Sequence, residues 1–248
     1  MDASLTLAGV LALLGLGLVF GLKHATEVDH VVAVSTIVSQ NRNLMRSAMV
    51  GALWGAGHTA ALLVTGAIVL WLRVTIPENV SNWLEFGVAL MIFGLGASAL
   101  WRALRKGREV HLHKHSHDGV SHVHVHFHEP TTRHNQDHSS PHTNAVHSIG
   151  SKPVLVGTMH GLAGSGAITL LVLTQIKSAW LGMLYLAIFG VGSIVGMLLM
   201  SGLIGLPFAL SSRNLSGFNH RLQAAAAGLS IAFGLWYAYQ TGLASGLF

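Results

Sequence analysis

Long apolar segments separated by short polar stretches dominate the chain. Each long segment has about 20 residues or more, the length that an α-helix needs to cross the hydrocarbon core of a bilayer. The predicted spans are residues 5–24, 47–72, 80–104, 153–176, 179–210 and 219–241. The first span either ends near residue 24 or continues to residue 38, because apolar residues resume after a polar interruption. The predicted fold class is all-α, a polytopic membrane protein with six transmembrane helices.

A polar stretch divides these spans into two groups of three. We expect a first three-helix repeat over residues 1–105, a histidine-rich loop over 106–152 and a second repeat over 153–248. Three pairs of segments match at a near-constant offset of 135 or 136 residues: 21–25 with 157–161, 54–58 with 189–193, and 85–101 with 220–236. Because three spans is an odd number, the two repeats would run in opposite senses, and inverted repeats are typical of transporters.

The composition supports membrane insertion and limits the chemistry. Of the 248 residues, 51% are hydrophobic and only 9% are charged, which cannot make a soluble surface. There is no cysteine, so disulfides and thiolate metal ligands are excluded. The net charge of +5 does not indicate nucleic-acid binding, because the basic residues flank apolar spans. Residues 1–4 lack a basic signal-peptide region, so we expect the first apolar segment to be retained.

The distribution of Lys and Arg predicts the orientation. Eleven lie in the segments that would share one side with the long loop, against two on the other side: Arg42, Arg46, Arg102, Arg105, Lys106, Arg108, Lys114, Arg133, Lys152, Arg213 and Arg221, against Arg73 and Lys177. Positive residues favour the cytoplasmic side. We therefore expect a protein of the cell inner membrane, with both termini outside and the long loop in the cytoplasm.

The candidate chemistry begins in residues 23–30, where polar groups interrupt the apolar pattern. On a regular helix, His24, Glu27 and His30 would share an arc of about 120°, while Asp29 would point to the opposite side. Ionisable groups at membrane depth are costly and typically functional. Either the helix unwinds here, as in broken transporter helices, or Asp29 orients a histidine without touching the ion.

Two histidines in other spans are candidate ligands. His58 lies between small residues at a depth similar to the first cluster, and His160 is the repeat counterpart of His24. Each could instead be a hydrogen-bonded packing residue. Glu85 and His220 lie at span ends, where an interfacial role is expected. Imidazole and carboxylate ligands suit nickel, cobalt, zinc or copper(II).

The long loop holds twelve of the seventeen histidines: His111, His113, His115, His117, His122, His124, His126, His128, His134, His138, His142 and His147. Histidine-rich tracts bind metals, and a segment with few apolar residues is expected to be disordered. In 111–117 and 122–128 the histidines alternate, so an extended chain would place them on one face. We expect a flexible, low-affinity metal buffer or sensor in the cytoplasm; the alternative is a polar linker with incidental histidines.

The pattern His24-x-x-x-x-Asp29-His30, followed by Gly57-His58, resembles the nickel–cobalt transporter family, especially its shorter urease-accessory-like NicO branch. Residues 21–36 and the His-Gly-Leu-Ala-Gly-Ser segment at 160–165 are also similar to that branch. The resemblance implies a secondary permease for Ni²⁺ or Co²⁺, with His24, Asp29, His30 and His58 on the metal pathway. The acid-containing fourth-span motif of the longer permeases is replaced here by residues 161–167.

Several functions remain open from the sequence. Moving a divalent cation through about 100 mV, inside negative, releases roughly 4.6 kcal/mol, which favours uptake over proton-coupled efflux. A membrane metalloenzyme or a metal sensor is a weaker alternative. We expect no enzyme activity and no prosthetic group, only transported Ni²⁺ or Co²⁺. The expected partners are the bilayer, the metal ion and cytoplasmic nickel chaperones; the oligomeric state is open.

Overall fold

The computed structural model describes residues 6–41, 43–74, 76–106, 111–117, 120–126, 150–163, 178–214 and 216–248. The helices are α1 (Leu7–His24), α2 (Val28–Val38), α3 (Leu44–Leu72), α4 (Glu78–Lys106), α5 (Lys152–Leu162), α7 (Ala179–Asn214), α8 (Ser216–Ala238) and the π-helical turn η1 (Tyr239–Ala244). Two strands, β1 (His111–His117) and β2 (Val120–His126), form a hairpin.

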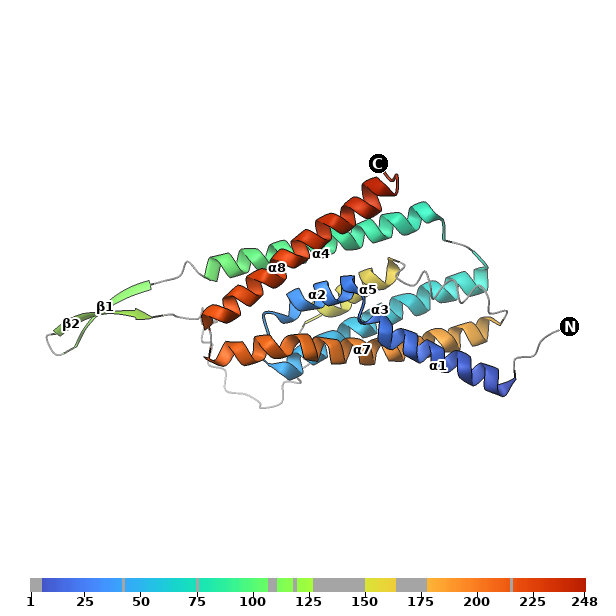
Figure 1. Cartoon of the computed structure of the whole chain (residues 1–248), viewed down its shortest axis with the longest axis horizontal. Coiled ribbons are helices and arrows are strands. Elements are labelled where there is room, and N and C mark those ends of the chain that lie inside the picture. The colour runs from blue at the N-terminus through green and yellow to red at the C-terminus, as the bar shows by residue number, and fades with distance from the viewer. Residues whose placement is uncertain are drawn as a thin grey trace.

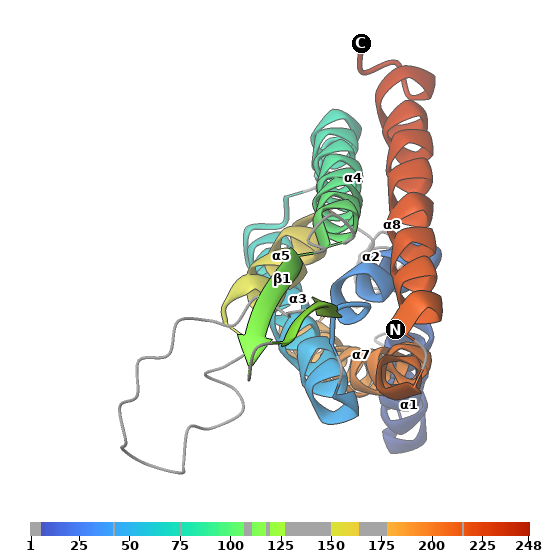
Figure 2. The ribbon, with the colours of Figure 1, turned by 90° about the vertical axis from the view of Figure 1, so that its left-hand side faces the viewer.

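The helices form an elongated bundle with the hairpin at one end and the N-terminus at the other (Figure 1). The main helix pairs are α3 with α7, α4 with α8, α3 with α5, and α1 with α7. Seen from the hairpin end, α2 lies among the longer helices (Figure 2), and it contacts α3, α4, α7 and α8. Thr36 on α2 is hydrogen-bonded to Ser230 on α8, whose hydroxyl donates to the Val32 carbonyl at 3.2 Å.

Four of the described helices are long and apolar enough to cross a membrane: Leu7–His24, Leu44–Leu72, Glu78–Arg105 and Ala179–Ser211. Large apolar side chains on their outer faces are exposed, such as Leu199 and Leu203 on α7 at 59% and 64%. Such a surface suits contact with lipid rather than water. The helical, membrane-spanning class is therefore confirmed, whereas the count of six spans is not.

The first predicted span is two helices joined by a turn. α1 ends at His24 and α2 begins at Val28, because Glu27 takes an extended backbone conformation (φ −64°, ψ 147°). The turn satisfies its own backbone groups: the Thr26 amide donates to the Lys23 carbonyl at 2.8 Å and the Glu27 amide donates to the His24 carbonyl at 3.1 Å. The unwound helix, one of the two sequence-based alternatives, is observed.

The fourth predicted span is described only in its first half. α5 ends at Leu162, and Ala163 closes the last turn by donating its amide to the His160 carbonyl at 3.2 Å. Residues 164–177, the second half of that predicted span, lie outside the described part of the chain. Both α1 and α5 therefore carry a histidine in their last turn.

Glycine allows two of these helix pairs to approach closely. A Cβ atom at Gly21 on α1 would overlap the Phe189 carbonyl oxygen on α7, and one at Gly157 on α5 would overlap the Trp54 carbonyl oxygen on α3. Close backbone approach through small residues is the usual means of helix packing in lipid. The two contacts hold α1 and α5 against the long helices.

Within the histidine-rich loop, the structure describes an antiparallel hairpin and the few residues at the two ends of the loop. Its register pairs three sets of histidines directly: His111 with His126, His113 with His124, and His115 with His122. This strand pairing was not predicted, although the alternating pattern suits an extended chain. The other six loop histidines that were expected to bind metal are His117, which pairs with Val120, and five that lie outside the described residues: His128, His134, His138, His142 and His147.

We expect Gly157→Ala to destabilise the protein by about 1–3 kcal/mol, because the new methyl group overlaps backbone atoms of α3. The matched control is Gly87→Ala on α4, where no atom lies within 4 Å of the added Cβ. That control should be neutral or stabilising by up to about 1 kcal/mol, from helix propensity alone. Thermal unfolding in detergent measures both. Equal effects of the two substitutions would contradict the close approach of α5 and α3.

Candidate metal site

Four histidines from four helices meet inside the bundle. His24 ends α1, His30 lies in the first turn of α2, His58 lies within α3 and His160 lies in the last turn of α5. All four are buried, with at most 3% of their surface exposed. His30 is central: its ring centroid lies 4.4 Å from that of His24 and 4.2 Å from that of His160.

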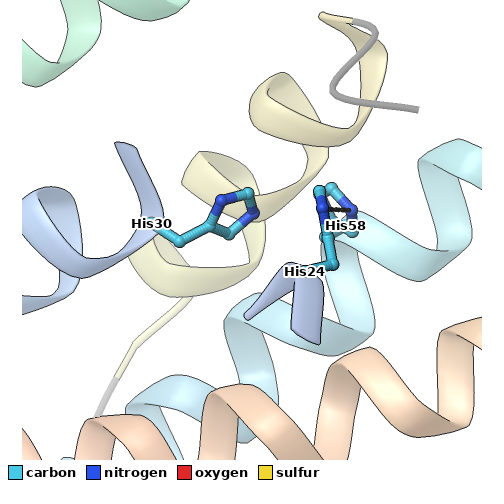
Figure 3. Close-up of side chains that lie close together, drawn as sticks. All are labelled: His24, His30 and His58. Atoms are coloured by element: carbon cyan, nitrogen blue, oxygen red, sulfur yellow. Dashed lines mark hydrogen bonds between the residues drawn. The ribbon is translucent and has the colours of Figure 1, made fainter. Parts of the chain in front are cut away.

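The rings of His24 and His58 approach each other through their nitrogen atoms. Their Nε2 atoms are 3.0 Å apart, and a ring nitrogen of His30 faces this pair (Figure 3). Two nitrogens that bind one ion at about 2.0–2.1 Å stand roughly 2.9 Å apart at a right angle and about 3.3 Å apart in a tetrahedron. The observed separation therefore suits two ligands of a single ion as well as a hydrogen bond between neutral rings.

Asp29 joins His30 and His160. His160 Nε2 donates to Asp29 Oδ2 at 2.7 Å, and His30 Nδ1 donates to Asp29 Oδ1 at 3.1 Å. The Asp29 side chain is 15% exposed. On a continuous helix it would point away from the histidines, but the turn after His24 redirects α2 and brings it into the cluster.

Glu27 is at the edge of the cluster. His24 Nδ1 donates to Glu27 Oε2 at 3.0 Å, and the Glu27 side chain is 43% exposed. A carboxylate that accepts one ring N–H fixes the tautomer of a histidine and leaves the other nitrogen free for a metal. Glu27 therefore turns Nε2 of His24 toward His58, and Asp29 acts in the same way on two rings.

Several ring nitrogens in the cluster are left without a protein partner. Among the described residues, the buried side-chain atoms with no hydrogen bond include His30 Nε2, His58 Nδ1 and His160 Nδ1. Leaving a buried polar atom unsatisfied costs about 1–3 kcal/mol. Three such atoms in one cluster indicate a site built for a ligand. Within the described part of the chain, two groups have ligand atoms close enough to hold an ion: His24, His30 and His58, and Asp29, His30 and His160.

An open pocket of about 360 Å³, called the cavity below, borders the two carboxylates next to the histidines. It is lined by Glu27, Val28, Asp29, Phe233, Trp236 and Tyr237. Both carboxylates next to the histidines therefore face open space, so a cation in the cavity would meet oxygen ligands before imidazoles.

Two residues near the cluster were not predicted from sequence. Trp54 is fully buried and its ring lies nearly parallel to that of His30, with centroids 5.9 Å apart. Its position one helical turn before His58 could have indicated a shared face. Tyr237 lines the cavity and donates its hydroxyl to Glu85 Oε2 at 3.4 Å, so Glu85 is tied to the cavity wall rather than only to the membrane interface. His220 lies at the start of α8, outside both ligand groups.

Apolar helices long enough to span a bilayer enclose a buried cluster of four histidines and an aspartate, at the break between α1 and α2 and at the end of α5. This arrangement defines a membrane protein that handles metal cations. The comparisons identify the family. The NicO family model, described as a high-affinity nickel-transport protein, matches residues 10–216. The chain belongs to the NicO family of nickel transporters. It is therefore a transport protein and not an enzyme.

Two curated relatives are similar to this chain. The urease accessory protein UreH of Bacillus sp. (strain TB-90) is 39% identical over 246 residues, 96% of each chain. The chloroplast protein FOR GROWTH AND FERTILITY 2 of Arabidopsis thaliana is 37% identical over 76 residues, 30% of this chain and 20% of the relative. No solved structure matches the chain.

We expect Asp29→Asn to weaken nickel binding by about 10–100-fold, because the charge that orients two buried rings is lost. Glu27→Gln is the matched comparison: it removes a carboxylate that touches one ring and is more exposed, so its loss should be smaller than that of Asp29→Asn. Equilibrium binding of Ni²⁺ to the purified variants measures both. A larger loss for Glu27→Gln would contradict the arrangement described.

Proposed function

We propose that this protein moves Ni²⁺ across the membrane through the cluster of His24, Glu27, Asp29, His30, His58 and His160. The observation that carries the proposal is the set of buried imidazoles with unpaired nitrogens, held in place by two carboxylates. Neutral imidazole and carboxylate are suitable ligands for Ni²⁺. They are equally suitable for Co²⁺, which we propose as a second substrate.

The helix ends support cation binding at this place. α1 and α5 both end at the cluster, and the C-terminal end of a helix carries partial negative charge. α2 begins there with Asp29 in its first turn, where a carboxylate is favoured. Transporters commonly bind their substrates between such half-helices.

We also propose six spans arranged as two inverted three-helix repeats. The supporting observation is that equivalent residues make equivalent contacts. Gly21 lies against the Phe189 carbonyl, and Gly157 lies against the Trp54 carbonyl. Gly21 and Gly157 are related by the repeat offset of 136 residues, and Trp54 and Phe189 by 135. A two-fold relation between the halves would account for both contacts at once.

For orientation, we propose that both termini are outside the cell and that the histidine-rich loop is in the cytoplasm, following the excess of Lys and Arg. Uptake is then favoured, because the membrane potential alone supplies roughly 4.6 kcal/mol per divalent ion. The name of the Bacillus relative, a urease accessory protein, also fits a role in supplying metal. The loop would receive the arriving ion and pass it to cytoplasmic nickel chaperones.

The first test is nickel accumulation in cells that express wild type, His24→Ala or His220→Ala. Because His24 contributes Nε2 to the buried cluster, we expect its loss to reduce accumulation at least about tenfold. His220 lies outside both ligand groups and should retain the wild-type rate.

Ion flux into liposomes that contain the purified protein distinguishes a transporter from a sensor, since a sensor would give no flux. Equal accumulation by wild type and His24→Ala would remove His24 from the pathway. Nickel loss from wild-type cells, rather than gain, would establish efflux as the direction.

The second test removes residues 111–147 from the loop. If the loop is a buffer, the initial rate of nickel flux into liposomes should stay within about twofold of the wild type, because the buried cluster is untouched. The amount of nickel bound to the protein at equilibrium should fall, since twelve histidines are deleted. Loss of the initial flux would show that the loop takes part in translocation.

A further inference from the structure

The buried cluster contains two ligand groups that overlap in one residue. His24, His30 and His58 form the first group, and Asp29, His30 and His160 form the second. We propose that the transported ion occupies these two positions in turn, with His30 as the ligand common to both. This inference rests on the proposed metal-transport function and adds a path through the cluster to it.

The ring of His30 is placed to serve both positions. Its Nδ1 atom lies 3.1 Å from Asp29, in the second group, whereas its Nε2 atom has no hydrogen-bond partner. Figure 3 shows a ring nitrogen of His30 directed toward His24 and His58. The two nitrogens lie on different edges of the imidazole, so an ion bound to one is not bound to the other. The ring therefore stands between two positions rather than inside one.

Asp29 has a different role in each position. When the ion is held by His24, His30 and His58, Asp29 accepts the N–H groups of His30 and His160 and orients them. When the ion is in the second position, the carboxylate is itself a ligand, and both rings carry their proton on the nitrogen turned away from it. Each ring keeps one proton in both states but carries it on the other nitrogen, so the step includes a tautomer change in each ring and no net gain or loss of protons.

The cavity determines which position is loaded from it. Asp29, a ligand of the second position, lines the cavity, whereas all four histidines are at most 3% exposed. Glu27 is the other carboxylate that lines the cavity, and it accepts a hydrogen bond from His24 Nδ1. This contact keeps Nε2 of the His24 ring facing His58. An ion in the cavity therefore reaches the Asp29 position first and the three-histidine position second.

Two divalent ions bound to the two nitrogens of one imidazole would repel strongly, because the site is buried and poorly screened. The two positions are therefore occupied one at a time. Weak binding at each, with three protein ligands instead of five, would also let the ion leave.

The test uses Co²⁺, whose visible absorption depends on its ligands, and the full-length protein with the twelve loop histidines replaced by asparagine. His58→Gln removes only the first group, His160→Gln removes only the second, and His30→Gln removes both. We expect the two single-group variants each to bind one Co²⁺, about 10–100-fold more weakly than the parent protein, with two different spectra. We expect His30→Gln to lose binding by more than 100-fold, and all three variants to lose flux.

If His58→Gln and His160→Gln both lose binding as completely as His30→Gln, or if both give the parent spectrum, the cluster is one site and the two-position path is wrong. In that case the parent protein would still bind and transport Co²⁺, so the proposed transport function would stand. A parent protein that neither binds nor transports the ion would instead overturn the transport function. His24→Gln removes the same group as His58→Gln and replaces it if that variant does not fold.

Discussion

The break between α1 and α2 is the constraint on which the metal site depends. A membrane helix satisfies its own backbone hydrogen bonds, so an interruption in lipid is costly. Here the turn at residues 25–27 recovers two of those bonds, from Thr26 to Lys23 and from Glu27 to His24, and Ala25 is buried at 2% exposure. Because the chain changes direction at Glu27, the side chains on either side of the turn can face the same point. A straight helix would separate Asp29 from the histidines.

Close helix packing supplies the rest of the site. His58 and His160 come from segments about 100 residues apart, and they meet because α5 lies directly against α3. Gly57, Gly157 and Gly161 make that approach possible, since a Cβ at any of them would overlap backbone carbonyl oxygens of the other helix. The apolar bundle thus provides a dry, closely packed frame, and the carboxylates of Asp29 and Glu27 orient the imidazoles within it. Rigid positioning and a low dielectric both strengthen a cation site, provided that the charges are balanced by the arriving ion.

The sequence-based predictions succeeded where a local pattern was sufficient. Apolar length predicted the membrane helices α1, α3, α4 and α7, and the spacing of His24, Asp29 and His30 indicated the family. They left two alternatives open where the backbone departs from regular geometry. The angles calculated for a continuous helix separated Asp29 from the histidines, and no proline marked the break that the structure shows between α1 and α2. For the fourth predicted span, the structure describes only α5, which ends at Leu162, and the rest of that prediction lies outside the described residues. Trp54 and Tyr237 were missed because aromatic residues in apolar spans are usually packing residues.

The sequence by itself therefore determined the class of protein, the residues with ligand chemistry and the exclusion of thiolate sites, because these follow from hydropathy, residue type and the absence of cysteine. Only the tertiary structure decided how those residues combine. It places Asp29 within hydrogen-bond distance of His160, which lies 131 residues away along the chain. It also places His30 in both groups of ligands. Ligand geometry depends on distances between helices and on a turn of three residues, and neither is encoded in the periodicity of any one segment.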